Sequence, residues 1–375
     1  MNLRLVVLGA TGSIGRQTLE VAKALGIRVV GISVHTRVDA ALKIAREFGI
    51  EVVAVTGLEC VKPTALENVK LVTGERTVEQ LVKLTAPDTV VVAVPGIAGL
   101  DAVLQAYPYV RRLCLANKES VVVGGRYLKR LLRDAGVEVL PVDSEHSAVL
   151  QLLEAARPVK VILTASGGAL RDLPLEELEN ATVSQVLAHP NWQMGAKVTV
   201  DSATMVNKGL ELFEAMWFFN LAPHQVDAAI CRDSFVHAAV VFEDGVVKFH
   251  AGFPDMRVPI AYALTKPDRR WKGRVPELVG RSITFEPVPF DRYPAFALAK
   301  EILRERDTLK VGYCVADEVA VDAFLKGKIR FGEIYRMIEK VVESVEAADL
   351  DSWEEIEEAL EATQRISKDV MRRWK

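Results

Sequence analysis

The chain has 375 residues, of which 50% are hydrophobic and 26% are charged, and its formal net charge is -3. A chain of this length exceeds one ordinary core, so two or three domains are expected. The small net charge favours neither nucleic acid nor a membrane surface as a partner. The apolar run at the N-terminus is too short for a signal peptide, and no run of about 18 apolar residues predicts a membrane span.

The cysteines Cys60, Cys114, Cys231 and Cys314 are far apart in the sequence. This spacing predicts neither a disulfide framework nor a cysteine zinc site. Buried free thiols are the default interpretation, and they are typical of a reducing compartment. We therefore expect a cytoplasmic protein whose partners are small molecules.

Strand-like and helix-like segments alternate through residues 1–142. Apolar runs rich in β-forming residues lie at Leu3–Leu8, Val29–Val34, Val52–Val55, Val90–Val94, Arg112–Ala116 and Val137–Val142, and amphipathic stretches such as Ser13–Leu25 and Val38–Phe48 separate several of them. Near-continuous aliphatic strands between helices indicate a parallel sheet covered on both faces. The pattern predicts an α/β fold with an N-terminal doubly wound, Rossmann-type domain.

The pattern changes after residue 142. Residues 143–265 carry β-like segments at Val159–Leu163, Ala228–Ile230, Val236–Phe242 and Val246–His250, which predict an α+β catalytic domain with a mixed or antiparallel sheet. Four prolines among charged residues indicate a linker at 266–291. Apolar residues at helical spacing predict a C-terminal helical bundle at 292–375, and Ser352 with Glu355 predicts a capping box for its last helix.

A glycine loop, Gly9-Ala10-Thr11-Gly12-Ser13-Ile14-Gly15, joins the first predicted strand to the first predicted helix. Glycines let the backbone approach a pyrophosphate, and the helix start supplies amide donors. The loop therefore predicts a bound dinucleotide, although a tight turn without a ligand is the plainer alternative.

The end of the second strand bears on the choice between NAD and NADP. An acid about 20 residues beyond the loop would hold the ribose 2′-hydroxyl. Here the chain reads Ile32-Ser33-Val34-His35-Thr36-Arg37, with no carboxylate before Asp39. Because a guanidinium suits a 2′-phosphate, Arg37 favours NADPH. Arg37 could also be an ordinary solvated residue at a helix start.

Two acids follow the strand that ends near Val142. If the backbone of Asp143-Ser144-Glu145-His146 stays extended, Asp143 and Glu145 project to one side and could chelate a hard divalent cation. Solvated acids are the more frequent explanation of such a pair.

Residues 200–211 add a third acid. Ser202 is expected to cap a helix that runs into Leu212, and Asn207, Lys208 and Glu211 share one face of that helix. This face suits an anionic phosphate beside a cation, although Lys208 and Glu211 could form a simple intrahelical ion pair. We interpret Glu214, one turn further, as structural or solvated.

Three further segments suit the same kind of site. Ser166-Gly167-Gly168 could bind an oxyanion or be an ordinary glycine turn. The loop His189–Gly195 could close over a ligand or lie on the surface with Trp192 packed against the domain. In Asn117-Lys118-Glu119-Ser120, Lys118 could neutralise substrate charge or be a solvated residue at a helix start.

Together these motifs resemble the 1-deoxy-D-xylulose 5-phosphate reductoisomerase family of the methylerythritol phosphate route to isoprenoids. The matching pieces, in the family's order, are GATGSIG (9–15), LANKES (115–120), VDSEH (142–146), SGG (166–168), HPNWQMG (189–195), VDSATMVNKGLE (200–211) and PDMR (254–257). Among the departures, Cys231-Arg232-Asp233-Ser234 stands where the family commonly has His-Pro-Gln-Ser, which puts local structure near the second sheet in doubt.

The resemblance implies a rearrangement of 1-deoxy-D-xylulose 5-phosphate, followed by reduction with NADPH to 2-C-methyl-D-erythritol 4-phosphate. It also implies a homodimer and one divalent cation, Mn²⁺, Mg²⁺ or Co²⁺, bound by Asp143, Glu145 and Glu211. The implied catalytic and substrate contacts are Lys118, Ser144, Glu145, Ser166, His189, Ser202, Asn207, Lys208 and Glu211. The implied cofactor positions are Gly9, Thr11, Gly12, Ser13, Ile14, Arg37, Asn117, Glu119 and Gly195.

Two other functions are alternatives to this one, and each makes its own demand on the sequence. A semialdehyde-type NADP dehydrogenase needs a nucleophilic cysteine with an activating base, and Cys114 lies in an apolar strand without an obvious partner. A non-catalytic NADPH-binding regulator would not need Asp143, Glu145 and Glu211 together.

Overall fold

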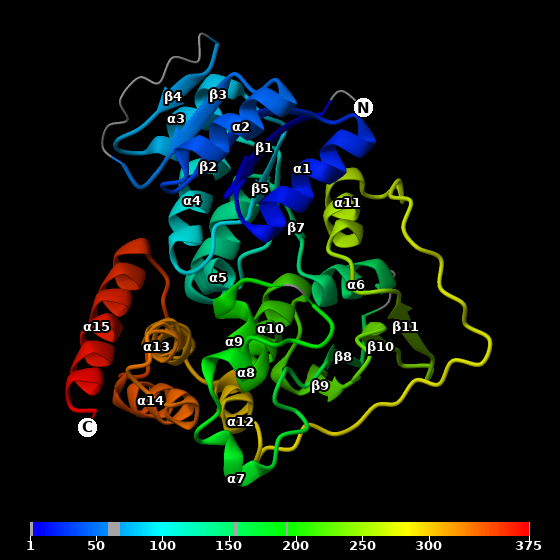
Figure 1. Cartoon of the computed structure of the whole chain (residues 1–375), viewed down its shortest axis with the longest axis vertical. Coiled ribbons are helices and arrows are strands. Elements are labelled where there is room, and N and C mark those ends of the chain that lie inside the picture. The colour runs from blue at the N-terminus through cyan, green and yellow to red at the C-terminus, as the bar shows by residue number, and fades with distance from the viewer. Residues whose placement is uncertain (1–2, 59–67, 154–156, 193, 375) are drawn as a thin grey trace. The chain divides into compact units, whose positions relative to one another are not determined.

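The computed structural model describes residues 3–58, 68–153, 157–192 and 194–374, which form two compact units (Figure 1). The first unit comprises residues 1–120, 129–147 and 255–273, and the second comprises 121–128, 148–254 and 274–375. The predicted thiol of Cys60 and Gln193 of the loop at 189–195 lie outside the described residues. The predicted domain boundaries at 142, 265 and 291 stay predictions. None of the described helices meets the length and hydropathy needed to cross a bilayer.

The first unit is built on a parallel sheet. Its strands are β1 (Arg4–Leu8), β2 (Arg28–Val34), β3 (Val52–Val55), β4 (Lys70–Val72), β5 (Thr89–Val92), β6 (Arg112–Leu115) and β7 (Glu138–Pro141). Their order is β4-β3-β2-β1-β5-β6-β7, and all neighbouring pairs are parallel. The order reverses direction at β1, which confirms the doubly wound fold and places a topological switch point between β1 and β5. The sequence did not predict β4, a three-residue strand at the sheet edge.

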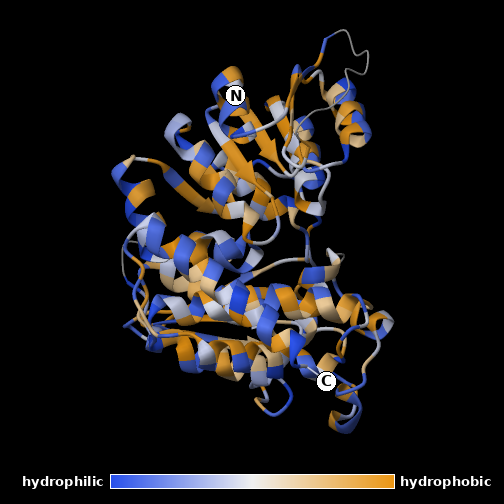
Figure 2. Ribbon diagram, turned by 90° about the vertical axis from the view of Figure 1, so that its left-hand side faces the viewer, coloured by the Kyte–Doolittle hydropathy of each residue, from blue (hydrophilic) through white to orange (hydrophobic). Residues whose placement is uncertain are grey.

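Helices connect these strands. They are α1 (Ser13–Leu25), α2 (Val38–Phe48), α3 (Thr77–Thr85), α4 (Ala98–Ala106), the 3₁₀ turn η1 (Tyr107–Tyr109) and α11 (Arg257–Thr265), while α5 (Lys118–Asp134) and α6 (Ser144–Leu152) contribute residues to both units. The bounds of α1 and α2 match the predicted ranges. Right-handed crossovers put α1 and α2 on one face of the sheet. Because both faces are covered, Leu5–Leu8 is fully buried, and hydrophobic residues are concentrated in the strands (Figure 2).

The second unit contains a mixed sheet, as expected. Its strands are β8 (Lys160–Ala165), β9 (Val226–Ile230), β10 (Val236–Val241) and β11 (Val247–Ala251), in the order β11-β10-β8-β9. β10 runs antiparallel to both β11 and β8, whereas β8 and β9 are parallel. A turn at Asp244-Gly245 joins β10 to β11, and Gly245 takes a φ of +81° there.

Helices make up the rest of the second unit. They are α7 (Leu175–Leu178), α8 (Val183–Val186), α9 (Ala196–Thr204), α10 (Val206–Phe219), the 3₁₀ turns η2 (Pro223–Gln225) and η3 (Ile302–Arg304), α12 (Pro294–Glu301), α13 (Asp307–Leu325), α14 (Phe331–Ser344) and α15 (Trp353–Arg372). α13, α14 and α15 pack against one another, which confirms the predicted C-terminal helices. The capping box of α15 is also confirmed, because the Ser352 hydroxyl accepts from the Glu355 amide at 3.2 Å and the Ser352 amide donates to the Glu355 carboxylate at 3.1 Å.

Candidate active site

The glycine loop leaves β1 and enters α1 at the switch point of the sheet. Gly9 has a φ of +81°, and a Cβ there would lie 2.4 Å from the carbonyl oxygen of Ala93. A Cβ at Gly15 would lie 2.3 Å from the carbonyl oxygen of Gly9, so the fold requires glycine at both positions. Gly12 caps α1 without a side-chain hydrogen bond, and the first turn of α1 holds no acid. The helix start can therefore receive an anionic ligand.

Asn117 and Glu119 lie at the carboxyl edge of the same sheet and are both buried. The Asn117 side chain accepts from the Ser120 amide at 2.7 Å, which caps α5, and it donates to the Gly96 carbonyl at 2.9 Å and to the Glu119 carboxylate at 2.8 Å. Asn117 thus joins the loop after β5 to the start of α5. Its role beside a cofactor stays a prediction.

Asp143 caps α6, contrary to the extended backbone that we expected around it. One of its carboxylate oxygens accepts from the amides of Glu145, at 3.0 Å, and His146, at 3.3 Å. These hydrogen bonds start the helix directly after Asp143, because a capping carboxylate satisfies amides that lack helical partners. The prediction of an extended Asp143-Ser144-Glu145 segment was therefore wrong.

The two acids nevertheless meet within the first turn of α6. Asp143 and Glu145 each offer a carboxylate oxygen within 4.8 Å of the other. The second Asp143 oxygen pairs with the Lys118 ammonium at 2.6 Å, and the Ser144 hydroxyl donates to Glu145 at 2.7 Å. Two carboxylates at this spacing suit a hard divalent cation. The buried His146, to which the sequence assigned no role, has its Nδ1 3.1 Å from Asp143.

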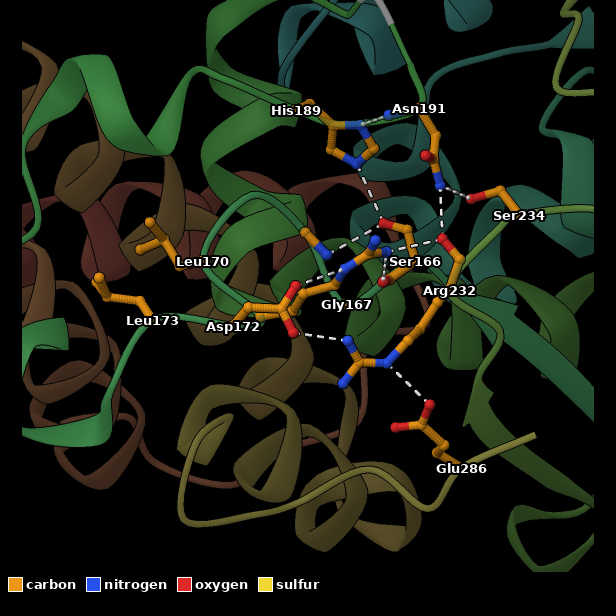
Figure 3. A network of polar contacts seen from close by, with 12 residues as sticks. Ser166, Gly167, Leu170, Asp172, Leu173, His189, Asn191, Arg232, Ser234 and Glu286 are labelled. Carbon is orange, nitrogen blue, oxygen red and sulfur yellow. Dashed lines mark hydrogen bonds and ion pairs between the residues drawn. The ribbon is translucent and has the colours of Figure 1, made fainter. Parts of the chain in front are cut away.

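Ser166, Gly167 and Gly168 form a glycine turn after β8 in the second unit, and Figure 3 labels the first two of these residues. Gly167 and Gly168 have φ values of +85° and +71°, and a Cβ at Gly168 would lie 2.6 Å from the Ser202 carbonyl oxygen. The turn therefore lies against the C-terminal part of α9. The Ser166 hydroxyl accepts from the Gly168 amide at 3.0 Å, which fixes the position of its oxygen.

His189 lies next to this turn, with its Nε2 3.1 Å from the Ser166 Oγ (Figure 3). Its Nδ1 accepts from the amides of Asn191, at 3.1 Å, and Trp192, at 3.0 Å, so the neutral ring carries its hydrogen on Nε2. Burial, together with the charge of Arg171, lowers the pKa of His189 to about 4. A neutral His189 therefore donates to Ser166, and the Ser166 hydroxyl hydrogen is left to donate to a ligand.

The loop that carries His189 is tied to the turn between β9 and β10. The Asn191 amide donates to the Arg232 carbonyl and to the Ser234 hydroxyl, both at 2.8 Å. Arg171 donates to the carbonyls of Ser166, at 2.8 Å, and Arg232, at 2.7 Å. Sequence reasoning gave Asn191, Arg171 and Ser234 no role, because the contacts that reach Arg232 and Ser234 join residues far apart in the chain.

The departure from the family pattern at residues 231–234 has a structural counterpart. The Arg232 guanidinium pairs with Asp172 at 2.6 Å and with Glu286 at 2.8 Å (Figure 3). Arg232 thereby connects the segment after β8 with the irregular segment before α12. The turn between β9 and β10 is therefore well anchored in this chain, although its sequence departs from the family pattern.

Ser202 does not cap the helix that carries Asn207, so this prediction was wrong. Ser202 lies inside α9, and α10 starts at Val206 after Met205, which has a φ of +62°. The left-handed residue ends one helix and starts the next without a side-chain cap. Gly195 is instead the residue that precedes α9.

The predicted polar face of α10 is confirmed. The Glu211 carboxylate accepts from the Asn207 amide and pairs with the Lys208 ammonium. Lys208 and Glu211 are both buried, so they are not a solvated surface pair, and their opposite charges stabilise each other away from water. Glu214 is also buried, which fits the structural interpretation and excludes the solvated one.

The predicted site residues are divided between the two units. Lys118, Asp143, Ser144 and Glu145 belong to the first unit, whereas Ser166, His189, Ser202, Asn207, Lys208 and Glu211 belong to the second. Within each unit the polar groups cluster as described above. The meeting of Glu211 with Asp143 and Glu145 stays a prediction.

A glycine loop at the switch point of a parallel sheet, a carboxylate pair and a donor-rich turn define a dinucleotide-binding α/β enzyme class that handles an anionic substrate. Family models confirm a more specific assignment. The model for 1-deoxy-D-xylulose 5-phosphate reductoisomerase matches residues 5–125, and two models for the C-terminal domain of this enzyme match residues 139–219 and 251–366. The chain belongs to the 1-deoxy-D-xylulose 5-phosphate reductoisomerase family.

Individual relatives agree with this assignment. The chain is 48% identical to 1-deoxy-D-xylulose 5-phosphate reductoisomerase of Thermotoga neapolitana, with 98% of this chain and 96% of the relative covered. It is 46% identical to the enzyme of Thermotoga maritima, with 97% of each covered. A solved reductoisomerase in complex with NADPH, fosmidomycin and magnesium has a TM-score of 0.90 at 32% identity, covering 99% of this chain and 98% of the other. The Zymomonas mobilis enzyme with NADPH has a TM-score of 0.87 at 30% identity, covering 99% of both chains.

Proposed function

We propose that the chain converts 1-deoxy-D-xylulose 5-phosphate to 2-C-methyl-D-erythritol 4-phosphate with NADPH and a divalent metal, in isoprenoid precursor biosynthesis. The observation that carries this proposal is the Asp143–Glu145 carboxylate pair at the end of β7, in the same sheet whose switch point holds the glycine loop. Family membership and relatives solved with NADPH and magnesium support it.

NADPH binding is assigned to the first unit, with Gly195 of the second unit as one further predicted contact. The backbone at Gly9, Thr11, Gly12, Ser13 and Ile14 would receive the pyrophosphate at the start of α1. Arg37, which is exposed just before α2, would face the 2′-phosphate, and Asn117 and Glu119 would lie along the nicotinamide side.

Asp143, Glu145 and Glu211 would hold the cation, because carboxylate oxygens are the ligands that hard divalent ions prefer. The metal supplies Lewis acidity, which polarises carbonyl and hydroxyl oxygens of a bound substrate. Lys118 compensates the charge of Asp143 at 2.6 Å and would lie beside the sugar backbone with Ser144.

The second unit would bind the substrate phosphate. Ser166 has its hydroxyl hydrogen available, because the Gly168 amide and the His189 imidazole already donate to its oxygen. Ser202, Asn207 and Lys208 would supply the remaining donors, with the ammonium of Lys208 balancing the phosphate charge. Because the phosphate lies away from the reacting carbons, its binding would fix the orientation of the substrate.

The test follows NADPH absorbance with 1-deoxy-D-xylulose 5-phosphate while Mg²⁺ or Mn²⁺ is titrated. A metal-dependent and saturable loss of absorbance is expected, and unchanged absorbance at every metal concentration would refute the proposal. Glu211→Gln should abolish turnover and leave NADPH binding nearly intact. Loss of both together would argue against a metal role for Glu211.

We also propose that two copies of the chain associate through an apolar surface in the second unit. β11 is an edge strand, and its Phe249 is 50% exposed and stacks on Phe285 with ring centroids 5.6 Å apart. Val275 and Val279 on the segment before α12 are 88% and 89% exposed. An edge strand with exposed apolar residues on it and on the segment before α12 suits a second copy, which would cover them.

Sedimentation equilibrium tests this association. The wild type should be a dimer, and Phe249→Glu should shift it towards the monomer. Leu84→Glu is the matched control, because Leu84 is similarly exposed, at 47%, but lies in the first unit. A monomeric wild type, or equal weakening by both variants, would contradict the assignment of this surface.

The cysteines support this enzyme over the semialdehyde dehydrogenase. Cys114, Cys231 and Cys314 are all buried, and Cys114 and Cys231 are free thiols, which supports a reducing, cytoplasmic location. Burial raises the pKa of Cys114 to about 12. Because the thiolate is the nucleophile, Cys114 is unsuited to covalent catalysis at neutral pH.

A further inference from the structure

Two adjacent side chains before α12 bind the backbone of the segment that follows β8. The Tyr293 hydroxyl donates to the Gly167 carbonyl at 2.8 Å. The Arg292 guanidinium donates to the carbonyls of Leu170, at 2.9 Å, and Leu173, at 2.7 Å. The three accepting residues are labelled in Figure 3. These two side chains therefore fix three carbonyls of a segment that lies 119 to 126 residues earlier in the chain.

The Tyr293 hydrogen bond orients one peptide unit of the glycine turn. The carbonyl of Gly167 and the amide of Gly168 belong to the same peptide unit, and in a trans peptide these two groups point in opposite directions. With the carbonyl held by Tyr293, the amide points the other way and donates to the Ser166 Oγ at 3.0 Å. Tyr293 thus sets, through one peptide unit, the direction from which Ser166 accepts a hydrogen bond.

Close contacts on both sides restrict the glycine turn. A Cβ at Gly167 would lie 3.3 Å from the Tyr293 hydroxyl oxygen, and a Cβ at Gly168 would lie 2.6 Å from the Ser202 carbonyl oxygen of α9. Tyr293 is 3% exposed, and burial raises its pKa to about 12, so the hydroxyl keeps its hydrogen at neutral pH. Removal of this hydroxyl would leave the buried Gly167 carbonyl without its donor, which is costly away from water.

We propose that Tyr293, supported by Arg292, is a positioning residue for Ser166 and thereby sets the affinity of the second unit for the phosphate of the substrate. Tyr293 does not touch the substrate in this assignment, because it acts through the peptide unit of Gly167 and Gly168. The inference rests on the proposed binding of the substrate phosphate by Ser166. It gives the start of the C-terminal helical part a role in substrate binding.

Steady-state kinetics on the full chain with NADPH and Mg²⁺ test this role through Tyr293→Phe, which removes only the hydroxyl. KM for 1-deoxy-D-xylulose 5-phosphate should rise by about fivefold, the order expected for loss of one neutral hydrogen bond, and kcat should change by less than about twofold. In a Ser166→Ala background the same substitution should raise KM by less than about twofold, because the two residues act in one relay. Additive effects in the double variant would overturn the proposal.

Thr308→Val is the matched control for the lost hydroxyl. Thr308 is also buried in the second unit, and its hydroxyl donates to the Glu346 carbonyl at 2.8 Å. This variant should leave KM unchanged, although urea titrations should show that it loses stability as Tyr293→Phe does. Equal increases of KM in the two variants would show a general loss of packing and contradict the role of Tyr293.

NADPH binding and a second variant separate this inference from the proposed function. The Kd for NADPH, measured by calorimetry, should be unchanged in Tyr293→Phe, since the cofactor is assigned mainly to the first unit. Arg292→Gln loosens the same segment, so it should also raise KM, and it replaces Tyr293→Phe if that variant does not fold. A wild type without metal-dependent NADPH oxidation would refute the proposed function. An active wild type whose KM both variants leave unchanged would overturn only the role of Tyr293.

Discussion

The Nε2 atom of His189 lies 3.1 Å from the Oγ atom of Ser166, although 23 residues separate the two in the chain. The amides that bind Nδ1 fix the tautomer, so the imidazole acts as a neutral donor. Ser166 is consequently oriented to donate its own hydrogen outward. A hydrogen-bond relay of this kind positions a hydroxyl without placing a second charge beside the phosphate that we propose Ser166 binds.

The neutral state of His189 should make the stability of the chain against urea depend on pH below 6.5. Its pKa in the folded chain, about 4, is below its ordinary 6.5, so the unfolded chain binds more protons between these values. The stability that neutral His189 contributes is present above pH 6.5 and is lost as pH falls towards 4. His189→Gln keeps a neutral donor, so its urea midpoint should fall less than the wild-type midpoint across this window. If the urea midpoints of the wild type and His189→Gln fell in parallel as the pH is lowered, His189 would not titrate in this way.

Asn191 should act as an anchor for the loop at 189–195. Its amide holds the Arg232 carbonyl and the Ser234 hydroxyl, each at 2.8 Å, and neither partner is a proposed substrate ligand. Asn191→Ala should lower kcat/KM for the sugar phosphate by about thirtyfold, mainly through KM, because two hydrogen bonds of about 1 kcal/mol each are lost. Hydrogen exchange of the Trp192 amide should speed up in parallel. Unchanged exchange with reduced activity would place Asn191 in direct contact with substrate instead.

Removing the cation from a buried ion network in the second unit should strongly lower the free energy of unfolding. Lys197 on α9 pairs with Asp201 at 2.8 Å and with Asp317 of α13 at 2.7 Å, and both acids are buried. Lys197→Met leaves buried carboxylates without this cation and should cost about 3 kcal/mol of unfolding free energy in urea titrations. Lys23→Met breaks an exposed pair with Glu47 and should cost less than about 1 kcal/mol. Similar losses for both would show that the Lys197 network is solvated.

Gly15 should tolerate no side chain. A Cβ there would lie 2.3 Å from the Gly9 carbonyl oxygen, which is backbone and cannot move aside cheaply. Gly15→Ala should therefore weaken NADPH binding by at least about tenfold, because the loop must shift away from the start of α1. Gly252→Ala is the control, since nothing lies within 4 Å of its added methyl group. Tight NADPH binding by Gly15→Ala would mean that the loop has another conformation in solution.

Local patterns predicted much of the fold because they depend on neighbours in the chain. Hydrophobic periodicity placed α1 and α2 at their observed bounds, and the spacing of Ser352 and Glu355 predicted the start of α15. The spacing of Asn207, Lys208 and Glu211 likewise predicted their contacts on α10. Prediction failed where a single residue changed the backbone. Asp143 ended the strand by capping α6, and Met205 interrupted a helix that we expected to be continuous.

By itself, the sequence determined the type of each major element, the glycine loop and its family, because side-chain period and glycine spacing are properties of a local segment. Only the tertiary structure decided which atoms meet across the chain: the tautomer of His189, the anchoring of Asn191, the burial of Lys208 with Glu211, and the hydrogen bond from Tyr293 to Gly167. These depend on hydrogen bonds and burial between distant or differently oriented segments, whose geometry exists only after the strands and helices have packed.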